Sequence, residues 1–171
     1  MRSARFADGV EPGWENAERL KIGVAHGEAP DTFILAELDG SKLVLELRAP
    51  DEQAKVFSDI KFWRDLLVVG YGSAIYVVRL TDRTHTLIPA GGYFGSLDVG
   101  DAYCLVATDS AIIRLSPQGQ VMWRQGGLAA DGIIISWVRN GRVEARGQWD
   151  PPDAEWTEFV LDLETGGRHG A

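Results

Sequence analysis

Short runs of β-branched and aromatic residues, each closed by turn-forming residues, recur along most of the chain. Glycine supplies 20 of the 171 residues, about 12% against an average near 7%, and many of these glycines stand between the runs. This spacing is typical of many short strands joined by tight turns. The sequence therefore predicts a mainly β protein with antiparallel strands.

Two hairpins are especially clear. In TFILAELDGSKLVLEL the residues Asp39 and Gly40 suit the positive φ angles of a type I′ turn between two apolar runs. In IIISWVRNGRVEARGQW the turn falls at Asn140 and Gly141, and the unbroken run 133–135 indicates a strand buried on both faces. Further strands are expected at 66–72, 75–80, 84–88, 103–108, 111–116, 121–124 and 157–163.

The segment 51–64 allows two interpretations. Val56, Ile60 and Trp63 are spaced like the apolar face of a helix, and Pro50 suits a helix start. The same residues also fit a strand over 56–63, with loose alternation of polar and apolar side chains. We expect one short helix near 51–64, with the strand as the alternative.

Two stretches of the chain repeat one another. Each begins with an aspartate, Asp65 or Asp101, and runs through a strand to the tripeptide Ser-Ala-Ile, and each next strand ends in Arg-Leu. The serines of the two tripeptides are 37 residues apart, and a fainter third copy follows towards residue 167. Periods near 40 residues with about four strands each are typical of propeller blades.

The segment AIIRLSPQGQVMW (111–123) resembles the blade hairpin of β-propeller repeat proteins, particularly pyrroloquinoline-quinone-type and WD-like blades. In such hairpins a glycine turn joins two strands, and the second strand ends in tryptophan, the place that Trp123 takes here. FVLDLETGG (159–167) repeats the strand-and-turn half, so the resemblance covers residues 65–167. Ser116 stands where the family often has aspartate. The resemblance implies a propeller-like fold and no cofactor, because the family's catalytic residues have no matching positions.

These patterns predict a single β domain over 1–171, a propeller-like arrangement of about four blade-like units. The expected units are 18–49, 50–90, 91–125 and 131–167. The last unit lacks a fourth strand, which residues 18–27 are placed to supply, closing a ring. A half-ring that closes as a homodimer and a β-sandwich or barrel stay open as alternatives.

The charge of the chain argues against two classes of partner. It carries 25 acidic and 17 basic residues, a formal net charge of −8. Nucleic acids and anionic membrane surfaces both attract basic proteins, so neither is expected to bind. No signal peptide is recognisable, and no window reaches the ~18 apolar residues of a membrane helix. The lone Cys104 has apolar neighbours, which predicts a buried, inert thiol. We expect a cytoplasmic protein.

Signatures of catalysis are missing from the sequence. It has no Gly-x-Ser-x-Gly, no phosphate-binding glycine loop before a helix and no Cys-x-x-Cys. The histidines are not paired at metal-ligand spacing, so we expect no bound metal and no cofactor. The most notable cluster of carboxylates is Asp150, Asp153 and Glu155, in the proline-stiffened segment WDPPDAEW.

On a propeller-like fold, the loops between second and third strands and between successive units lie on one face. Here those loops carry aromatic side chains and arginine, which are enriched in binding hot spots. The candidate binding residues are Tyr71, Tyr93, Phe94, Asp109, Arg124, Trp149, Asp150, Asp153 and Trp156. We predict a non-catalytic binding module that presents rigid loops to a protein or peptide partner. The alternative is a metal-assisted or carboxylate-dependent hydrolase or lyase that acts on a small molecule through Asp150, Asp153 or Glu155.

Overall fold

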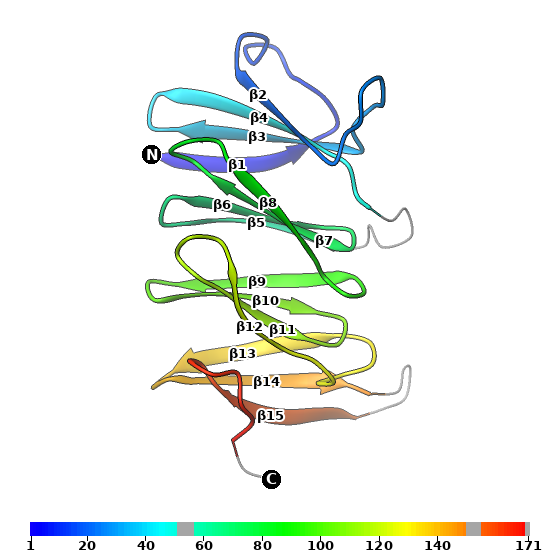
Figure 1. Cartoon of the computed structure of the whole chain (residues 1–171), viewed down its shortest axis with the longest axis vertical. Helices are drawn as coiled ribbons and strands as arrows, with labels where there is room; N and C mark the ends of the chain where they lie inside the picture. Colours follow the sequence, from blue (N-terminus) through cyan, green and yellow to red (C-terminus); the bar gives the residue numbers. More distant parts are fainter. Residues whose placement is uncertain (51–56, 150–154, 170–171) are drawn as a thin grey trace.

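The computed structural model describes residues 1–50, 57–149 and 155–169, which form fifteen β-strands in four sheets and no helix (Figure 1). The all-β prediction is therefore confirmed. Over the described residues 57–63 the expected helix is wrong, because Ser58–Trp63 is a strand that pairs with the strand following it. Residues 51–56 of that expectation lie outside the described part of the chain.

The second and third sheets are regular meanders and correspond to the two clear repeats. In each sheet the four strands lie side by side in chain order, and each is antiparallel to the next. The second sheet contains β5 (Ser58–Trp63), β6 (Leu66–Tyr71), β7 (Ala74–Arg79) and β8 (His85–Pro89). The third contains β9 (Phe94–Gly100), β10 (Tyr103–Thr108), β11 (Ile112–Leu115) and β12 (Val121–Gln125).

The first sheet has a different topology. It contains β1 (Arg2–Ala7), β2 (Glu18–Ile22), β3 (Thr32–Leu38) and β4 (Ser41–Leu47) in the spatial order β1-β3-β4-β2, with β2 parallel to β4. The expectation that 18–27 completes the last unit is wrong. Ile22 is buried and Leu20 half-buried in the apolar cluster between the first and second sheets, which holds β2 there.

The fourth sheet has three strands, β13 (Ile133–Arg139), β14 (Arg142–Gln148) and β15 (Trp156–Asp162). Beyond β15 the chain turns back, and the backbone N–H of His169 donates to the Val160 carbonyl at 2.8 Å. A single bridge between Leu161 and Arg168 accompanies this bond. A short contact thus occupies part of the place that a fourth strand takes in the second and third sheets.

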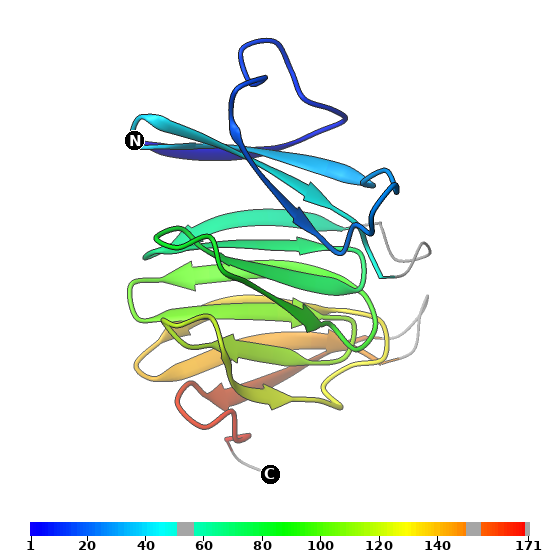
Figure 2. The ribbon, with the colours of Figure 1, turned by 45° about the horizontal axis from the view of Figure 1, so that its top comes forward.

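The four sheets stack in chain order, the first at the top of Figure 1 and the fourth at the bottom (Figures 1 and 2). The innermost strands β1, β5, β9 and β13 contact one another in succession. This is the predicted propeller-like arrangement. Over the described residues, however, the first and fourth sheets lie at opposite ends of the stack, so the four sheets of one chain do not close into a ring.

Apolar side chains fill the space between neighbouring sheets in three clusters. The first cluster includes Leu43 and Leu67 of the first and second sheets, the second includes Val68 and Val106 of the second and third, and the third includes Leu105 and Val143 of the third and fourth. Cys104 is buried in the second of these, as predicted, and burial raises the pKa of its thiol to about 12.

The arginines of the repeated Arg-Leu pair join successive sheets. Arg79 Nη2 donates to the Gln118 carbonyl at 3.1 Å, and Arg114 Nη1 donates to the Leu163 carbonyl at 2.7 Å. Two tryptophans act in the same way, because the indole nitrogens of Trp63 and Trp123 each donate at 2.9 Å to a carbonyl of the following sheet. The repeated residues therefore hold one blade-like sheet to the next.

The two ends of the stack differ from its interior. Trp14, in the loop between β1 and β2, packs on Leu35 and Val44 and covers the outer face of the first sheet. On the fourth sheet the Arg139 guanidinium lies 3.8 Å from the centroid of the Trp137 ring. Ile134 is exposed there, so the expectation that 133–135 is buried on both faces is wrong. The described residues place no further sheet beyond it.

Candidate functional site

Those of the predicted loops that fall in the described residues lie at one end of the sheets, where β5, β9 and β13 begin (right-hand side of Figure 1). Backbone hydrogen bonds connect them in succession. Phe94 N–H donates to the Gly72 carbonyl, Asp109 N–H to the Tyr93 carbonyl and Gly132 N–H to the Asp109 carbonyl, at 2.9, 3.1 and 2.7 Å. The loops of the second, third and fourth sheets thus form one continuous surface, the loop face.

An apolar cleft of about 360 Å³ opens on this loop face between the second, third and fourth sheets. We call it the aromatic cleft. The side chains of Phe57, Tyr93, Ile134 and Trp156 line it together with Asp131 and Gln148. Gly95, Ser96, Gly132 and Ile133 complete its lining. It joins residues almost 100 positions apart in the sequence, because β5, β9 and β13 begin there side by side and β14 pairs Gln148 with Trp156 at the start of β15.

Tyr93 is fixed within the aromatic cleft by contacts on two sides. Its ring stacks on Phe57, with 5.7 Å between the ring centroids and 29° between the ring planes. Its hydroxyl oxygen lies 2.9 Å from the Asp131 carbonyl oxygen and 3.0 Å from Asp131 Oδ1, both of which accept its hydrogen bond. Partial burial, with the bond to Asp131, raises the pKa of Tyr93 to about 12, so the phenol stays a neutral donor at physiological pH.

Two carboxylates accompany Tyr93. Asp131 is exposed at the cleft, and Asp109 is half-buried against Gly92, where a β-carbon would come within 1.9 Å of its Oδ2 atom. Asp109 Oδ1 accepts a hydrogen bond from the Ser110 hydroxyl at 3.2 Å. Among the described residues, neither carboxylate is within ion-pair distance of a lysine or arginine.

The predicted binding residues divide into groups. Tyr93 and Trp156 line the aromatic cleft, and Asp109 lies beside it. Phe94 is fully buried between the second and third sheets, so it belongs to the core and not to the loop face. Tyr71 packs towards the first sheet, with its ring 6.0 Å from that of Phe6.

The other candidates lie away from the aromatic cleft or outside the description. Arg124 donates to the Pro89 carbonyl and so ties β12 to the end of β8 in the preceding sheet. Trp149 is exposed and does not line the cleft. Asp150 and Asp153 lie outside the described residues, so the hydrolase or lyase alternative stays a prediction.

Sequence reasoning missed eight of the ten cleft residues, among them Phe57, Asp131, Ile134 and Gln148. Phe57 fell in the segment expected to be a helix, and Ile134 in the run expected to be buried. The alternative prediction of a strand over 56–63 could have identified Phe57, because it places this residue near the start of a strand. Nothing in the local sequence marks Gln148.

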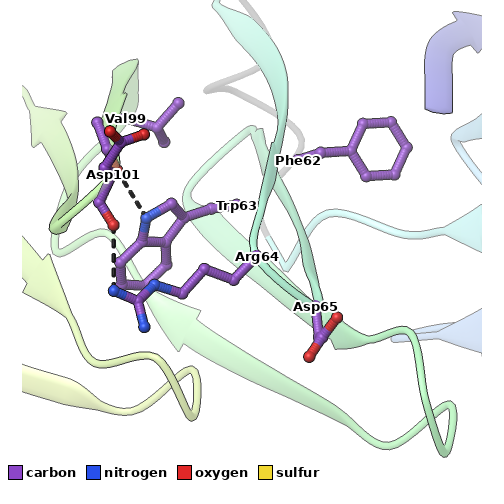
Figure 3. A pocket seen from close by; sticks show the side chains of 7 residues that line it. Phe62, Trp63, Arg64, Asp65, Val99 and Asp101 are labelled. Carbon is purple, nitrogen blue, oxygen red and sulfur yellow. Dashed lines mark hydrogen bonds between the residues drawn. The ribbon is translucent and has the colours of Figure 1, made fainter. Parts of the chain in front are cut away.

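A second hollow of about 550 Å³ lies at the opposite ends of β5 and β9 (Figure 3). The Trp63 indole and the Arg64 guanidinium point into it, and each already donates to a backbone carbonyl, of Gly100 at 2.9 Å and of Asp101 at 3.1 Å. Phe62 points away from them. These polar groups hold the second sheet to the third, so we assign this hollow a structural role.

Within the described residues, no group of three or more histidine, cysteine, aspartate and glutamate side chains is placed to hold a metal ion. The same part of the chain contains no helix long and apolar enough to cross a membrane.

Comparisons with known proteins concern the fold. No model of a protein family and no curated protein matches the chain. The computationally designed Ika8 protein is similar in structure, with 17% sequence identity and a TM-score of 0.52. The similarity covers 82% of this chain and 46% of the Ika8 chain. For the WD40 domain of Neurospora crassa Pan2 the similarity covers 81% of this chain and 45% of the Pan2 chain, with 11% sequence identity and a TM-score of 0.49. The chain thus spans a little under half the length of these solved chains, and the likeness to Ika8 shows the fold alone.

Proposed function

We propose that this protein is a non-catalytic binding module that holds a segment of a protein or peptide partner in the aromatic cleft. The observation that carries the proposal is the grouping of exposed apolar side chains. Phe57, Ile134 and Trp156 are 48%, 41% and 37% exposed, and all three line this one cleft. Single exposed apolar residues are ordinary on a protein surface, but a concave group of them is typical of a binding site.

The walls of the aromatic cleft are also well ordered for binding. The backbone bonds between the loops and the stack of Phe57 on Tyr93 hold this part of the cleft wall in place without a partner. A surface that is already ordered loses less conformational entropy when it binds, so more of the contact energy appears as affinity. This favours a module whose loops keep their shape on binding.

Trp156 offers the sharpest test because the chain supplies a matched control. Peptides are selected from a phage-displayed library of random dodecapeptides, and the affinity of a selected peptide is measured by isothermal titration calorimetry. Truncating a tryptophan hot spot costs at least about 2 kcal/mol, so Trp156→Ala should weaken binding about 30-fold. Trp149→Ala removes a tryptophan of similar exposure, 46% against 37%, outside the cleft.

Binding that is equally strong in wild type, Trp156→Ala and Trp149→Ala would overturn the proposed site. A library that yields no binding peptide would also count against the proposal. Circular dichroism and thermal unfolding of both variants establish that the loss at Trp156 is local, since neither tryptophan belongs to the buried core.

A further inference from the structure

The Tyr93 end of the aromatic cleft combines an aromatic wall with negative charge. Asp131 Oδ1 accepts the Tyr93 hydroxyl at 3.0 Å, and the backbone N–H of Asp131 donates to the Gln148 carbonyl at 3.1 Å. These bonds fix the carboxylate at the cleft. No hydrogen bond to the second oxygen, Oδ2, is found among the described residues, so this atom can accept a donor from outside the chain.

Another wall of the cleft, Trp156, has a positive charge beside it. The Arg146 guanidinium lies 5.2 Å from the centroid of the Trp156 ring, although Arg146 itself does not line the cleft. A second cation placed beside Trp156 would be repelled by Arg146, whereas one placed beside Tyr93 would meet Asp131 and, close by, Asp109. The charge beside Tyr93 is thus negative, and the charge beside Trp156 is positive.

Resting on the proposed function, we infer that the partner is a peptide segment with an arginine or lysine next to an apolar residue. The cation contacts the Asp131 carboxylate at the Tyr93 end, and the apolar side chain packs between Ile134 and Trp156. A guanidinium suits this position particularly well, because it can hydrogen-bond to the carboxylate while its face rests on an aromatic ring. The net charge of −8 adds a long-range attraction for such a basic segment.

The contributions of the charge and of the cleft can be separated with one selected peptide and two changes. In the peptide, arginine is replaced by citrulline, which keeps the shape of the side chain and removes its charge. In the protein, Asp131→Asn keeps an oxygen that can accept the hydrogen bond from the Tyr93 hydroxyl but removes the negative charge of the carboxylate. We expect each change alone to weaken binding about fivefold in 50 mM salt, and less in 500 mM salt because ions screen an exposed pair.

The two changes together should weaken binding no more than either alone, because each removes the same ion pair. The matched control is Asp101→Asn, because Asp101 is an exposed aspartate at the other end of the sheets. This substitution should leave the affinity for the peptide unchanged. Selected peptides without enrichment in arginine or lysine, or an affinity that neither change alters, would overturn this inference. If Trp156→Ala still weakens binding about 30-fold in that case, the proposed function stands. If Trp156→Ala has no effect either, both fail.

Discussion

The ring of Phe94 lies directly against Gly70. A β-carbon on Gly70 would stand 2.0 Å from Phe94 Cε2, far inside van der Waals contact. Gly70 belongs to β6 and Phe94 begins β9, so the missing side chain is what lets the ring enter the space between the second and third sheets. A core aromatic and a glycine of the neighbouring sheet therefore form one packing unit.

Gly70→Ala should accordingly destabilise the protein. The buried ring has no room to move, and overpacking of a core costs ~1–3 kcal/mol. Urea unfolding followed by tryptophan fluorescence measures the change in the free energy of unfolding. Gly126→Ala is the control, because a β-carbon there meets nothing within 4 Å. Equal stability of the two variants would show that the two sheets can separate locally without cost.

Arg114 and Arg79 provide a second comparison, since they hold equivalent places in the repeat. The Arg114 side chain is 7% exposed and pairs with Glu164 at 2.9 Å, whereas that of Arg79 is 41% exposed. Arg114→Ala should lower the free energy of unfolding by about 3 kcal/mol, because its hydrogen bonds are largely buried. Arg79→Ala should cost under about 1 kcal/mol. Thermal denaturation of both variants tests this order, and similar losses would contradict it.

Stability should fall in acid through two turn carboxylates. The backbone N–H and the hydroxyl of Thr84 donate to Asp82, and those of Thr165 donate to Asp162. These bonds hold the pKa of each aspartate below its usual value of 3.8. The folded state thus favours the ionised form, so its stabilisation is complete above pH ~4 and is lost as the pH falls through the lower folded pKa.

Melting temperatures measured from pH 7 down to pH 2 test this. The double variant Asp82→Asn, Asp162→Asn should show a shallower acid decline than wild type, because it lacks both titrating groups. Asp98 acts in the opposite sense, since burial raises its pKa and its ionisation disfavours the folded state. An acid decline of equal slope in wild type and variant would contradict the assignment to these turns.

The ends of the stack predict that the chain is a monomer. Trp14 covers the first sheet, and Lys42 holds it there, with its Nζ atom 2.8 Å from the Gly13 carbonyl oxygen and 4.8 Å from the Trp14 ring centroid. On the fourth sheet the Arg139 guanidinium lies over the Trp137 ring. Polar or covered outer faces are how stacked repeats stay soluble. Light scattering should give the monomer mass, 18.7 kDa, at micromolar concentration. A stable dimer would contradict this and favour ring closure between copies.

Local features of the chain were the most predictable. The turns at Asp39-Gly40 and Asn140-Gly141 have positive φ angles, 41° and 103° in the first and 52° and 72° in the second, as the residue types indicated. The repeated Ser-Ala-Ile and Arg-Leu segments also marked the second and third sheets correctly. Both signals depend on residues that are close in sequence, so no knowledge of distant contacts was needed.

Distant contacts decided the remainder. Ser58–Trp63 has apolar spacing that suits a helix, but pairing with β6 and contact with β9 make it a strand. Phe57, Tyr93 and Ile134 line one cleft only because β5, β9 and β13 begin side by side. The sequence by itself determined short strands, tight turns and repeated units, since these follow from backbone preferences and nearest neighbours. The tertiary structure alone decided which side chains are buried and where the aromatic cleft lies, because burial depends on which sheet packs against each face.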